Sequence, residues 1–360
     1  MIALFYGTRP QVIKSSVLRP ALERLGPVYA VDTGQHYDSP LSGLLYAQLG
    51  LDPPHRSLEI GSGSHAEQTA LILTRGEAVL RELAPRVVVV IGDTNSTLGS
   101  ALAAAKLRIP VVHVEAGLRS GDRMVAEELN RRAVDAVASL LCTPCVAASQ
   151  RMQSEHPDAM IRETGDIALD VLLAARGRLP SPEAFVPGLP RSYLFATLHR
   201  AELVDDPEVL GGVLRALAAI GTATVLALHP RTANALAAQG VNQDRIGLLR
   251  IIPPVGYLES LALTSGARAV VTDSGGLQRE AYWLGTPCVT VRRETEWQET
   301  TACEANRLVA AEDGTRGLAA AVTAQVARWN GENRWARDAY GSGHAADAIT
   351  TAVSELLQCA

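Results

Sequence analysis

The sequence predicts an α/β protein of two domains, each built from alternating strands and helices around a parallel sheet. Short apolar, β-branched runs such as Val87 to Ile91 have the pattern of buried parallel strands. Segments of helical periodicity separate these runs, at the spacing that right-handed parallel crossovers require. At 360 residues the chain is too long for one ordinary core, so two domains of about 150–180 residues are expected.

The composition narrows the class of protein. With 47% hydrophobic and 20% charged residues the chain is typical of a soluble globular protein, and a net charge of −5 without a basic tract argues against a general nucleic-acid surface. Met1 leads directly into an apolar strand, and no apolar run approaches the roughly 20 residues that span a bilayer, so we expect no signal peptide and no membrane segment.

The cysteines indicate a reducing compartment, because five is an odd number in a long chain. Cys142 and Cys145 have the spacing of a redox or metal pair, but Cys142 ends an apolar run and no second Cys or His pair follows. Buried structural cysteines are the favoured interpretation, and a redox or metal pair is the alternative.

The first strand and helix carry a candidate anion site. The strand at residues 2–6 meets a Gly-Thr-Arg-Pro turn, and a helix follows from about Gln11. Arg9 and Lys14 lie near the start of this helix, at the carboxyl end of a strand, where free amide groups favour an anion. The alternative is a solvated turn.

Three carboxylates are predicted to converge in the first half of the chain. Asp93 follows the buried strand 87–91, and Glu115 follows the next strand, so both belong to one sheet edge. Glu127 opens a helix that begins near residue 126 and shares a helical face with Arg131. Clustered carboxylates shift one another's pKa values apart and can provide an acid and a base together. Ordinary caps and strand ends are the alternative.

The second half restarts the alternation after a Pro-Ser-Pro segment at residues 180–182, and its run at 287–291 is taken as the last strand. We expect domains at 1–166 and 167–342, with a final helix at 343–360. Basic residues at the strand ends give the second half a cationic rim: His199, Arg200, His229, Arg231 and Arg292.

The segment 267–280 predicts a phosphate site. Its apolar strand ends in a small-residue turn, Thr272 to Gly276, and a helix follows, so backbone N–H groups and the positive end of the helix dipole lie at the sheet edge. Glu280, in the second helical turn, is placed to accept hydrogen bonds from a ribose. A capped βα turn is the alternative.

Other cofactor motifs are not found in the sequence. It contains no Walker A motif, no GxGxxG after the first strand, no HExxH and no paired CxxC. Nucleotide hydrolysis, NAD binding and a metal centre are therefore unsupported, and no cofactor is predicted.

Eleven motifs in order resemble the non-hydrolysing UDP-N-acetylglucosamine 2-epimerases over essentially the whole chain. They are GTRP at Gly7, TGQHYD at Thr33, GSGSHAEQT at Gly61, GDT at Gly92, HVEAGLRSGD at His113, AEELNRR at Ala126, LHRAE at Leu198, HPRT at His229, TDSGGLQREA at Thr272, ETEWQET at Glu294 and YGSG at Tyr340.

The resemblance implies a GT-B architecture, in which two Rossmann-like, doubly wound domains face each other across a cleft and the last helix crosses back to the N-terminal domain. It also implies the interconversion of UDP-GlcNAc and UDP-ManNAc without NAD or metal. UDP is eliminated to leave a 2-acetamidoglucal and is then re-added after protonation of C2 on the opposite face. By analogy with the family we expect a homodimer, and the reducing compartment indicated by the cysteines predicts a cytoplasmic location.

The resemblance also assigns roles to the candidate residues. The catalytic positions are Asp93, Glu115, Glu127, His199, Lys14 and Arg131. The positions that bind UDP or the sugar are Arg9, Arg200, His229, Arg231, Ser274, Gly275, Gly276, Glu280 and Arg292.

Three departures from the family pattern stand out. Gln11 replaces the usual Glu after GTRP and removes a charge near the site, and Ser342 replaces an Asp. Many bacterial members bind a second UDP-GlcNAc as an activator, but the stretches 35–38 and 61–64 have the pattern of other branches, so allosteric activation is not expected here.

Several alternatives to this function stay open. Relatives that act on UDP-2,3-diacetamido-glucuronic acid share ETEW and HPRT, and Arg292 with Arg293 would suit a C6 carboxylate. A GT-B glycosyltransferase, a hydrolysing 2-epimerase and a catalytically silent nucleotide-sugar binder are the others. The three carboxylates argue against the transferase and the silent binder.

Overall fold

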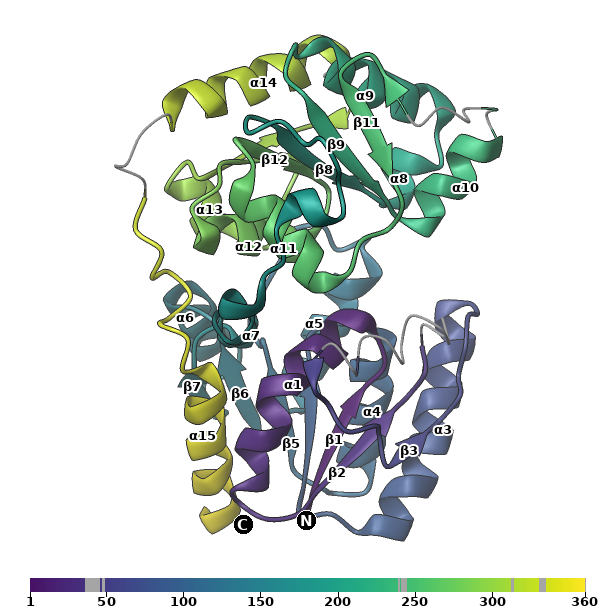
Figure 1. The fold of residues 1–360 in the computed structure, drawn as a ribbon. Coiled ribbons are helices and arrows are strands. Elements are labelled where there is room, and N and C mark those ends of the chain that lie inside the picture. The colour runs from purple at the N-terminus through teal and green to yellow at the C-terminus, as the bar shows by residue number, and fades with distance from the viewer. Residues whose placement is uncertain are drawn as a thin grey trace. The chain divides into compact units, whose positions relative to one another are not determined.

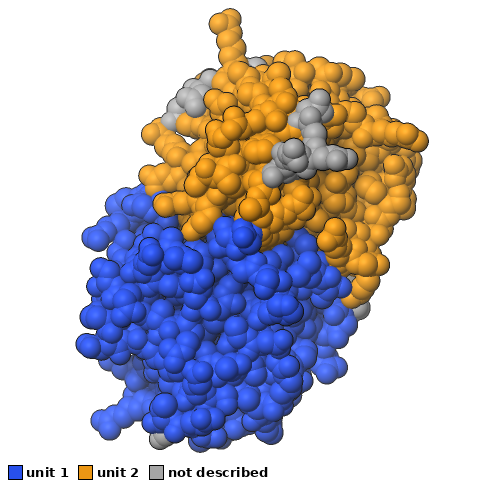
Figure 2. Space-filling model, turned by 90° about the vertical axis from the view of Figure 1, so that its left-hand side faces the viewer, with its two compact units in different colours: residues 1–174, 338–360 blue, residues 175–337 orange. Residues whose placement is uncertain are grey.

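The computed structural model describes residues 1–35, 46, 49–238, 240, 245–311, 314–329 and 335–359. The chain divides into two compact units, coloured separately in Figure 2. Unit 1 comprises Met1–Ala174 and Asp338–Ala360, and unit 2 comprises Ala175–Arg337. The domain boundaries expected from the sequence, after residues 166 and 342, stay predictions.

Unit 1 contains a parallel sheet, with seven strands in the described part of the chain, in the order β3-β2-β1-β4-β5-β6-β7. The direction of strand addition reverses between β1 and β4, which makes this pair the switch point where open α/β sheets bind ligands. The strands are β1 (Ile2–Tyr6), β2 (Val28–Asp32), β3 (Arg56–Ser57), β4 (Val87–Ile91), β5 (Val111–Val114), β6 (Leu140–Thr143) and β7 (Met160–Glu163).

Alternation along the strands gives this sheet a hydrophobic core on each face. In β1, Ile2 and Leu4 join the core beneath α1 and α15, whereas Ala3 and Phe5 join the core beneath α3 and α4. Figure 1 shows these two helix layers on opposite faces of the sheet. The helices of unit 1 are α1 (Arg9–Glu23), α3 (His65–Leu83), α4 (Asn95–Lys106), α5 (Ala126–Val137), α6 (Val146–Glu155), α7 (Ile167–Ala175) and α15 (Ala345–Cys359).

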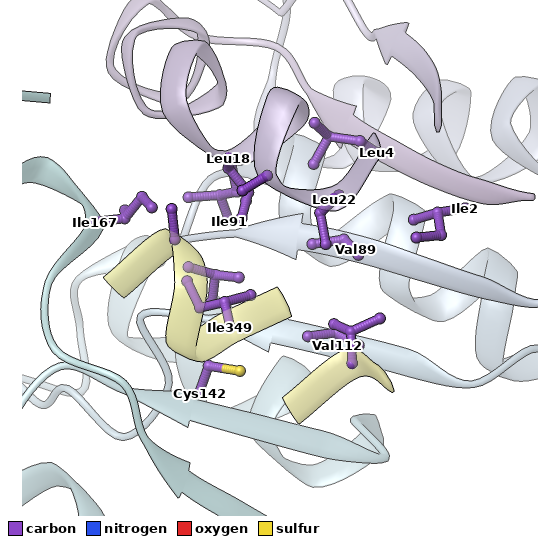
Figure 3. Packing of buried hydrophobic residues seen from close by; sticks show 14 of the residues in the cluster. Ile2, Leu4, Leu18, Leu22, Val89, Ile91, Val112, Cys142, Ile167 and Ile349 are labelled. Atoms are coloured by element: carbon purple, nitrogen blue, oxygen red, sulfur yellow. The ribbon is translucent and has the colours of Figure 1, made fainter. Parts of the chain in front are cut away.

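The last helix of the chain, α15, packs on unit 1, as the resemblance implied. Its Ile349 is fully buried and lies between Ile91 of β4 and Cys142 of β6 (Figure 3). Asp170 of α7 accepts hydrogen bonds from the first backbone N–H groups of α15, at Ala345 and Ala346. A carboxylate from another helix thus caps α15 and joins it to the N-terminal part of the chain.

Unit 2 contains a second sheet, with seven described strands in the order β10-β11-β9-β8-β12-β13-β14. All its pairings are parallel except that of β10 with β11. The switch point lies between β8 and β12. The strands are β8 (Leu194–Leu198), β9 (Thr224–Leu228), β10 (Arg245–Ile246), β11 (Leu249–Ile252), β12 (Ala269–Thr272), β13 (Cys288–Val291) and β14 (Asn306–Val309).

One sequence expectation about this sheet is wrong. The strand at 287–291 is not the last, because β14 pairs with β13 and leads into α14. The strand β14 begins with two polar residues, Asn306 and Arg307, and therefore lacks the apolar run that marks the other strands. Asn306 is buried because its side chain bonds Gln278 and Thr290.

The helices of unit 2 cover both faces of its sheet. One core includes side chains of α9, α10 and α14, and the other includes those of α11 and α12. They are α8 (Ala201–Val204), α9 (Pro207–Ala219), α10 (Pro230–Ala238), α11 (Tyr257–Gly266), α12 (Gly275–Leu284), α13 (Gln298–Ala302) and α14 (Gly314–Arg328), with short 3-10 turns at Arg176–Arg178 and Pro182–Ala184. Within the described residues, no helix combines the length and apolarity that crossing a membrane requires.

The cysteine pair is structural. Cys142 and Cys145 are both buried, and neither forms a disulfide. Burial raises the pKa of the Cys142 thiol to about 12, so the reactive thiolate is strongly disfavoured there.

Candidate active site

The switch point of unit 1 brings the β1–α1 turn beside the β4–α4 turn. The first turn passes very close to its neighbours at Gly7, where an added Cβ would lie 1.8 Å from Thr33 Oγ1 and 2.3 Å from Ser96 Oγ. Only glycine fits there, which explains the first residue of the GTRP motif. The turn therefore delivers Arg9 and helix α1 to the sheet edge that also carries Asp93.

Lys14 and Glu115 form a buried ion pair at this edge. Lys14 Nζ lies 2.5 Å from Glu115 Oε2, and both side chains are more than nine-tenths buried. Glu115 has a φ of 71°, a left-handed conformation that costs a non-glycine residue about 1–3 kcal/mol and is concentrated at functional sites. The sequence placed Lys14 at a candidate anion site, and in the structure its ammonium group pairs with the Glu115 carboxylate. Its catalytic role stays a prediction.

Asp93 is paired with Arg131 of α5. The Arg131 guanidinium bonds Asp93 Oδ2 and also lies 3.3 Å from Glu128 Oε2, one helical turn before it. Glu128 is fully buried, whereas the neighbouring Glu127 is exposed. The acidic partner of Arg131 on its own helix is thus Glu128, which was not among the residues predicted from the sequence although its i,i+3 spacing to Arg131 pointed to it.

The structure therefore brings together two of the three predicted carboxylates. Asp93 and Glu115 follow the neighbouring parallel strands β4 and β5, and each has a buried cation as its partner. Glu127 lies at the first turn of α5 with its side chain exposed, and its catalytic role stays a prediction.

In unit 2, the β8–β12 switch point is organised by Asp273, a residue for which the sequence predicted no role. Asp273 Oδ2 accepts hydrogen bonds of 2.7 Å from the backbone N–H groups of His199 and Arg200. Its other oxygen lies 2.9 Å from Nδ1 of the His199 ring. Burial alone would raise the pKa of Asp273, but the His199 ring and these backbone N–H groups outweigh it and lower that pKa. Asp273 thereby fixes the orientation of His199.

The small-residue turn after β12 opens helix α12 as predicted. Ser274 is its N-cap and accepts a hydrogen bond from Leu277 N. The turn is therefore a capped βα turn, and its role as a phosphate site stays a prediction. Gly275 and Gly276 occupy the first helical turn, where backbone N–H groups have no partner within a helix and favour an anion. Glu280 lies in the second turn of α12, half-buried.

The residues of the predicted cationic rim have three different sets of partners. His199 and Arg200 gather around Asp273, and the ring of His229 lies 5.2 Å from that of His199. Arg231 instead forms an exposed, two-pronged pair with an aspartate at the C-terminal end of α8, Asp205, at 2.6 and 2.8 Å.

Arg292, the remaining cation of the rim, lies 3.1 Å from Glu296, and both of their side chains are buried. Burial lowers the pKa of Arg292, although Glu296 opposes that effect. Its positive charge is therefore compensated within unit 2.

The two stretches compared with the activator site of other family members are described only in part. His36, Tyr37 and Asp38 lie outside the described residues. In the second stretch, Ser64 caps α3 by accepting a hydrogen bond from Glu67 N.

Within the described part of the chain, no group of three or more His, Cys, Asp or Glu side chains is arranged to hold a metal ion.

Comparison with known proteins identifies the family. The family model described as UDP-N-acetylglucosamine 2-epimerase matches residues 25–354 of the chain. The chain belongs to the UDP-N-acetylglucosamine 2-epimerase family. It is an isomerase of this class, as its resemblance in sequence implied.

Relatives of the 2-epimerase family align over most of their length. A UDP-2,3-diacetamido-2,3-dideoxy-D-glucuronate 2-epimerase of Pseudomonas aeruginosa is 40% identical over 322 residues, which cover 86% of this chain and 88% of the relative. A UDP-N-acetylglucosamine 2-epimerase of Methanocaldococcus jannaschii is 36% identical over 362 residues, with 97% of each chain covered.

Solved structures of the 2-epimerase family share the fold. A crystal structure of the Methanocaldococcus jannaschii UDP-GlcNAc 2-epimerase, in complex with UDP-GlcNAc and UDP, matches with a TM-score of 0.89 and 37% identity. The match covers 98% of this chain and 99% of that one. The predicted GT-B class, with two Rossmann-like sheets, is confirmed.

Proposed function

We propose that the protein interconverts UDP-GlcNAc and UDP-ManNAc by inverting C2 of the sugar. A carboxylate removes the C2 proton while the C1–O bond breaks and UDP departs with its electron pair, leaving 2-acetamidoglucal. A second acid then protonates C2 on the opposite face, and UDP adds again at C1. No atom is gained or lost overall, and no redox cofactor is required.

Unit 1 supplies the acid–base groups in this proposal. Asp93 and Glu115 each form an ion pair with a buried cation, which fixes the position of the carboxylate proposed to abstract the proton. Glu127, at the first turn of α5 with its side chain exposed, is the group proposed to return a proton to the glycal. This pair of strand-end carboxylates, each held by its own cation, is the observation that carries the proposal.

Unit 2 holds UDP in this proposal. The first-turn amides of α12 at Gly275 and Gly276, with Arg200 and the Asp273-oriented ring of His199, stabilise the charge that develops on the departing diphosphate. Glu280 accepts hydrogen bonds from the ribose. Arg9 of unit 1 is proposed as a further cation for the diphosphate.

Proton NMR in D2O tests the reaction. With UDP-GlcNAc and enzyme, we expect deuterium to replace H2 of the sugar while a new anomeric signal of UDP-ManNAc appears. Inversion without solvent exchange would contradict proton abstraction. Free ManNAc and UDP as the main products would instead indicate a hydrolysing enzyme, and product only in the presence of an acceptor would indicate a glycosyltransferase.

A second substrate candidate, UDP-2,3-diacetamido-glucuronic acid, is favoured by the 40% identity to the Pseudomonas aeruginosa enzyme. The Arg292–Glu296 pair favours UDP-GlcNAc, because an arginine that is already neutralised is poorly suited to bind a C6 carboxylate. Comparing kcat/KM for the two nucleotide sugars decides between them. A higher value for the uronate would reassign the substrate and leave the chemistry unchanged.

The homodimer and the cytoplasmic location are also proposals. The first rests on analogy with the family, and the second rests on the reducing compartment that the five cysteines indicate. Light scattering coupled to size-exclusion chromatography measures the first, and cell fractionation measures the second.

A further inference from the structure

The peptide segment that carries Asp93 is held at three successive carbonyl oxygens, each by a buried side chain from a different element. Gln11 Nε2 of α1 donates to the Ile91 oxygen at 2.7 Å. His113 Nε2 of β5 lies 2.8 Å from the Gly92 oxygen. Asn130 Nδ2 of α5 donates to the oxygen of Asp93 itself at 2.9 Å.

Each of the three side chains is almost completely buried, with exposed fractions of 2% for Gln11, 0% for His113 and 4% for Asn130. Buried polar groups are retained when their hydrogen bonds are made, and a missing partner costs about 1–3 kcal/mol. Three such side chains bound to consecutive carbonyls therefore restrict the segment more than strand pairing alone, in which the backbone N–H of Gly92 donates to the Val114 carbonyl at 2.9 Å.

Gln11 uses both ends of its amide. Its oxygen accepts from the backbone N–H groups of Gly7 and Thr8, and its nitrogen donates to the Ile91 oxygen and lies 2.9 Å from the hydroxyls of Thr94 and Thr97. It thereby ties the β1–α1 turn to the β4–α4 turn. A carboxylate at this position has no proton to donate to Ile91 when ionised. The departure from the family pattern at Gln11 is thus a gained hydrogen bond as well as a lost charge.

Both ring nitrogens of His113 lie within hydrogen-bond distance of an oxygen atom. Nε2 faces a carbonyl oxygen, which can only accept, and Nδ1 lies 2.7 Å from the Asp135 carboxylate. Asp135 also accepts from Arg119 at 2.7 Å and from Gly117 N, and despite its burial these groups and His113 lower its pKa, so it stays ionised. The His113 ring therefore links the buried Asp135 carboxylate to the Gly92 carbonyl.

We propose that Gln11, His113 and Asn130 are positioning residues that hold the 91–93 carbonyls and thereby fix the Asp93 carboxylate against Arg131. The proposal rests on the proposed function, in which Asp93 acts on the sugar. Side chains far from the chemistry matter in this way because a displacement of about 1 Å in a reacting group can cost on the order of 100-fold in rate.

The test compares Gln11→Met and Asn130→Ala with Gln325→Met. Gln325 in unit 2 is a matched control, because its buried amide likewise donates to backbone carbonyls. These are the carbonyls of Cys288, Glu304 and Ala305, none of which is a proposed site residue. We expect Gln11→Met and Asn130→Ala to lower kcat about 10- to 100-fold with KM within about twofold. Gln325→Met should lose similar thermal stability and keep kcat.

The double variant Gln11→Met/Asn130→Ala gives a second measurement. Because both side chains act on one segment, its loss in kcat should fall well short of the product of the two single losses. Multiplicative losses, or a kcat in Gln11→Met as high as in Gln325→Met, would overturn the proposal.

Amide hydrogen exchange gives a third measurement that needs no activity. Peptides covering residues 91–97 should exchange on the order of tenfold faster in Gln11→Met and Asn130→Ala, as expected for a lost buried hydrogen bond, and at the wild-type rate in Gln325→Met. Unchanged exchange in all three variants would refute the positioning role. If the wild type epimerises neither nucleotide sugar, the proposed function fails, and the exchange data alone decide whether these side chains hold the segment.

Discussion

Asp273 is a single buried carboxylate that connects two strand-end segments for which the sequence predicted separate roles. His199 follows β8 and Ser274 follows β12, and the sequence placed both at strand ends without a connection between them. Asp273 makes the connection, because it binds the backbone N–H and ring of His199 and the backbone N–H of Arg200. Its signal in the sequence was weak, since Asp is also common in βα turns as a cap.

Asp273→Asn should lower kcat about 10- to 100-fold and change the Kd for UDP much less. The amide can still accept from the two backbone N–H groups, but its NH2 group now faces His199 Nδ1, so the carboxylate contact that orients this ring beside the departing diphosphate is lost. Steady-state kinetics and titration calorimetry with UDP measure the two effects. A wild-type kcat would show that the His199–Asp273 pair has no part in the reaction.

At the scale of an element, helix α12 must begin with glycine because of what packs over it. A Cβ on Gly275 would lie 2.8 Å from Glu296 Oε1 and 3.3 Å from Trp297 Nε1. Glu296 cannot move away freely, because it is buried and paired with Arg292. At Gly276 an added Cβ would meet only Ser274 Oγ, at an ordinary 3.8 Å.

Gly275→Ala should therefore destabilise unit 2 by about 1–3 kcal/mol, the usual range for overpacking. Gly276→Ala is the matched control in the same helical turn, and we expect it to be neutral or to stabilise by up to about 1 kcal/mol because alanine favours a helix. Urea unfolding of the two variants measures the difference. Equal stabilities would mean that Glu296 does not restrict the start of α12.

At the scale of the whole molecule, the two units can be observed separately. All four tryptophans, Trp283, Trp297, Trp329 and Trp335, belong to unit 2. Tryptophan fluorescence therefore reports the unfolding of unit 2 within the intact chain, a distinction that matters because a chain of two units need not unfold in one step.

Acid should weaken unit 2 through Asp273. The folded pKa of Asp273 lies below its ordinary value of 3.8, so its contribution to stability is complete at neutral pH and is lost as the pH falls below about 4 and through the folded pKa. The difference in unfolding free energy between wild type and Asp273→Asn should thus shrink on acidification. Urea midpoints from tryptophan fluorescence at pH 7 and below pH 4 measure it, and a difference that does not change with pH would contradict the lowered pKa.

We expect substitutions in the two units to affect different steps, catalysis in unit 1 and UDP binding in unit 2. Asp93→Asn in unit 1 should lower kcat at least about 100-fold and leave the Kd for UDP within about twofold, because it removes a proposed acid–base group alone. Glu280→Gln in unit 2 should instead weaken UDP binding. Calorimetry and kinetics on both variants test this division, and a large loss of UDP affinity in Asp93→Asn would contradict it.

Much of the fold followed from local pattern. The run Val87–Ile91 is β4 in full, and the segment after Gly343 is α15, because apolar periodicity and turn residues report the burial of each element directly. The strand β14 has no such apolar pattern and was therefore not predicted, since its polar Asn306 is buried through hydrogen bonds to distant residues rather than through apolar packing.

The sequence by itself determined the two α/β halves, the family and the strand ends that carry the candidate site, because these depend on residue type and spacing along one segment. Only the tertiary structure decided which side chains meet: Lys14 with Glu115, Arg131 with Glu128, and Gln11 with the Ile91 carbonyl. The contacts of Lys14 and Gln11 join elements that are far apart in the chain. Arg131 pairs with Glu128 of its own helix because Glu128 is buried there, whereas the adjacent Glu127 is exposed. A local pattern indicates which face of an element is buried. Which side chains contact that face depends on the other elements that pack against it.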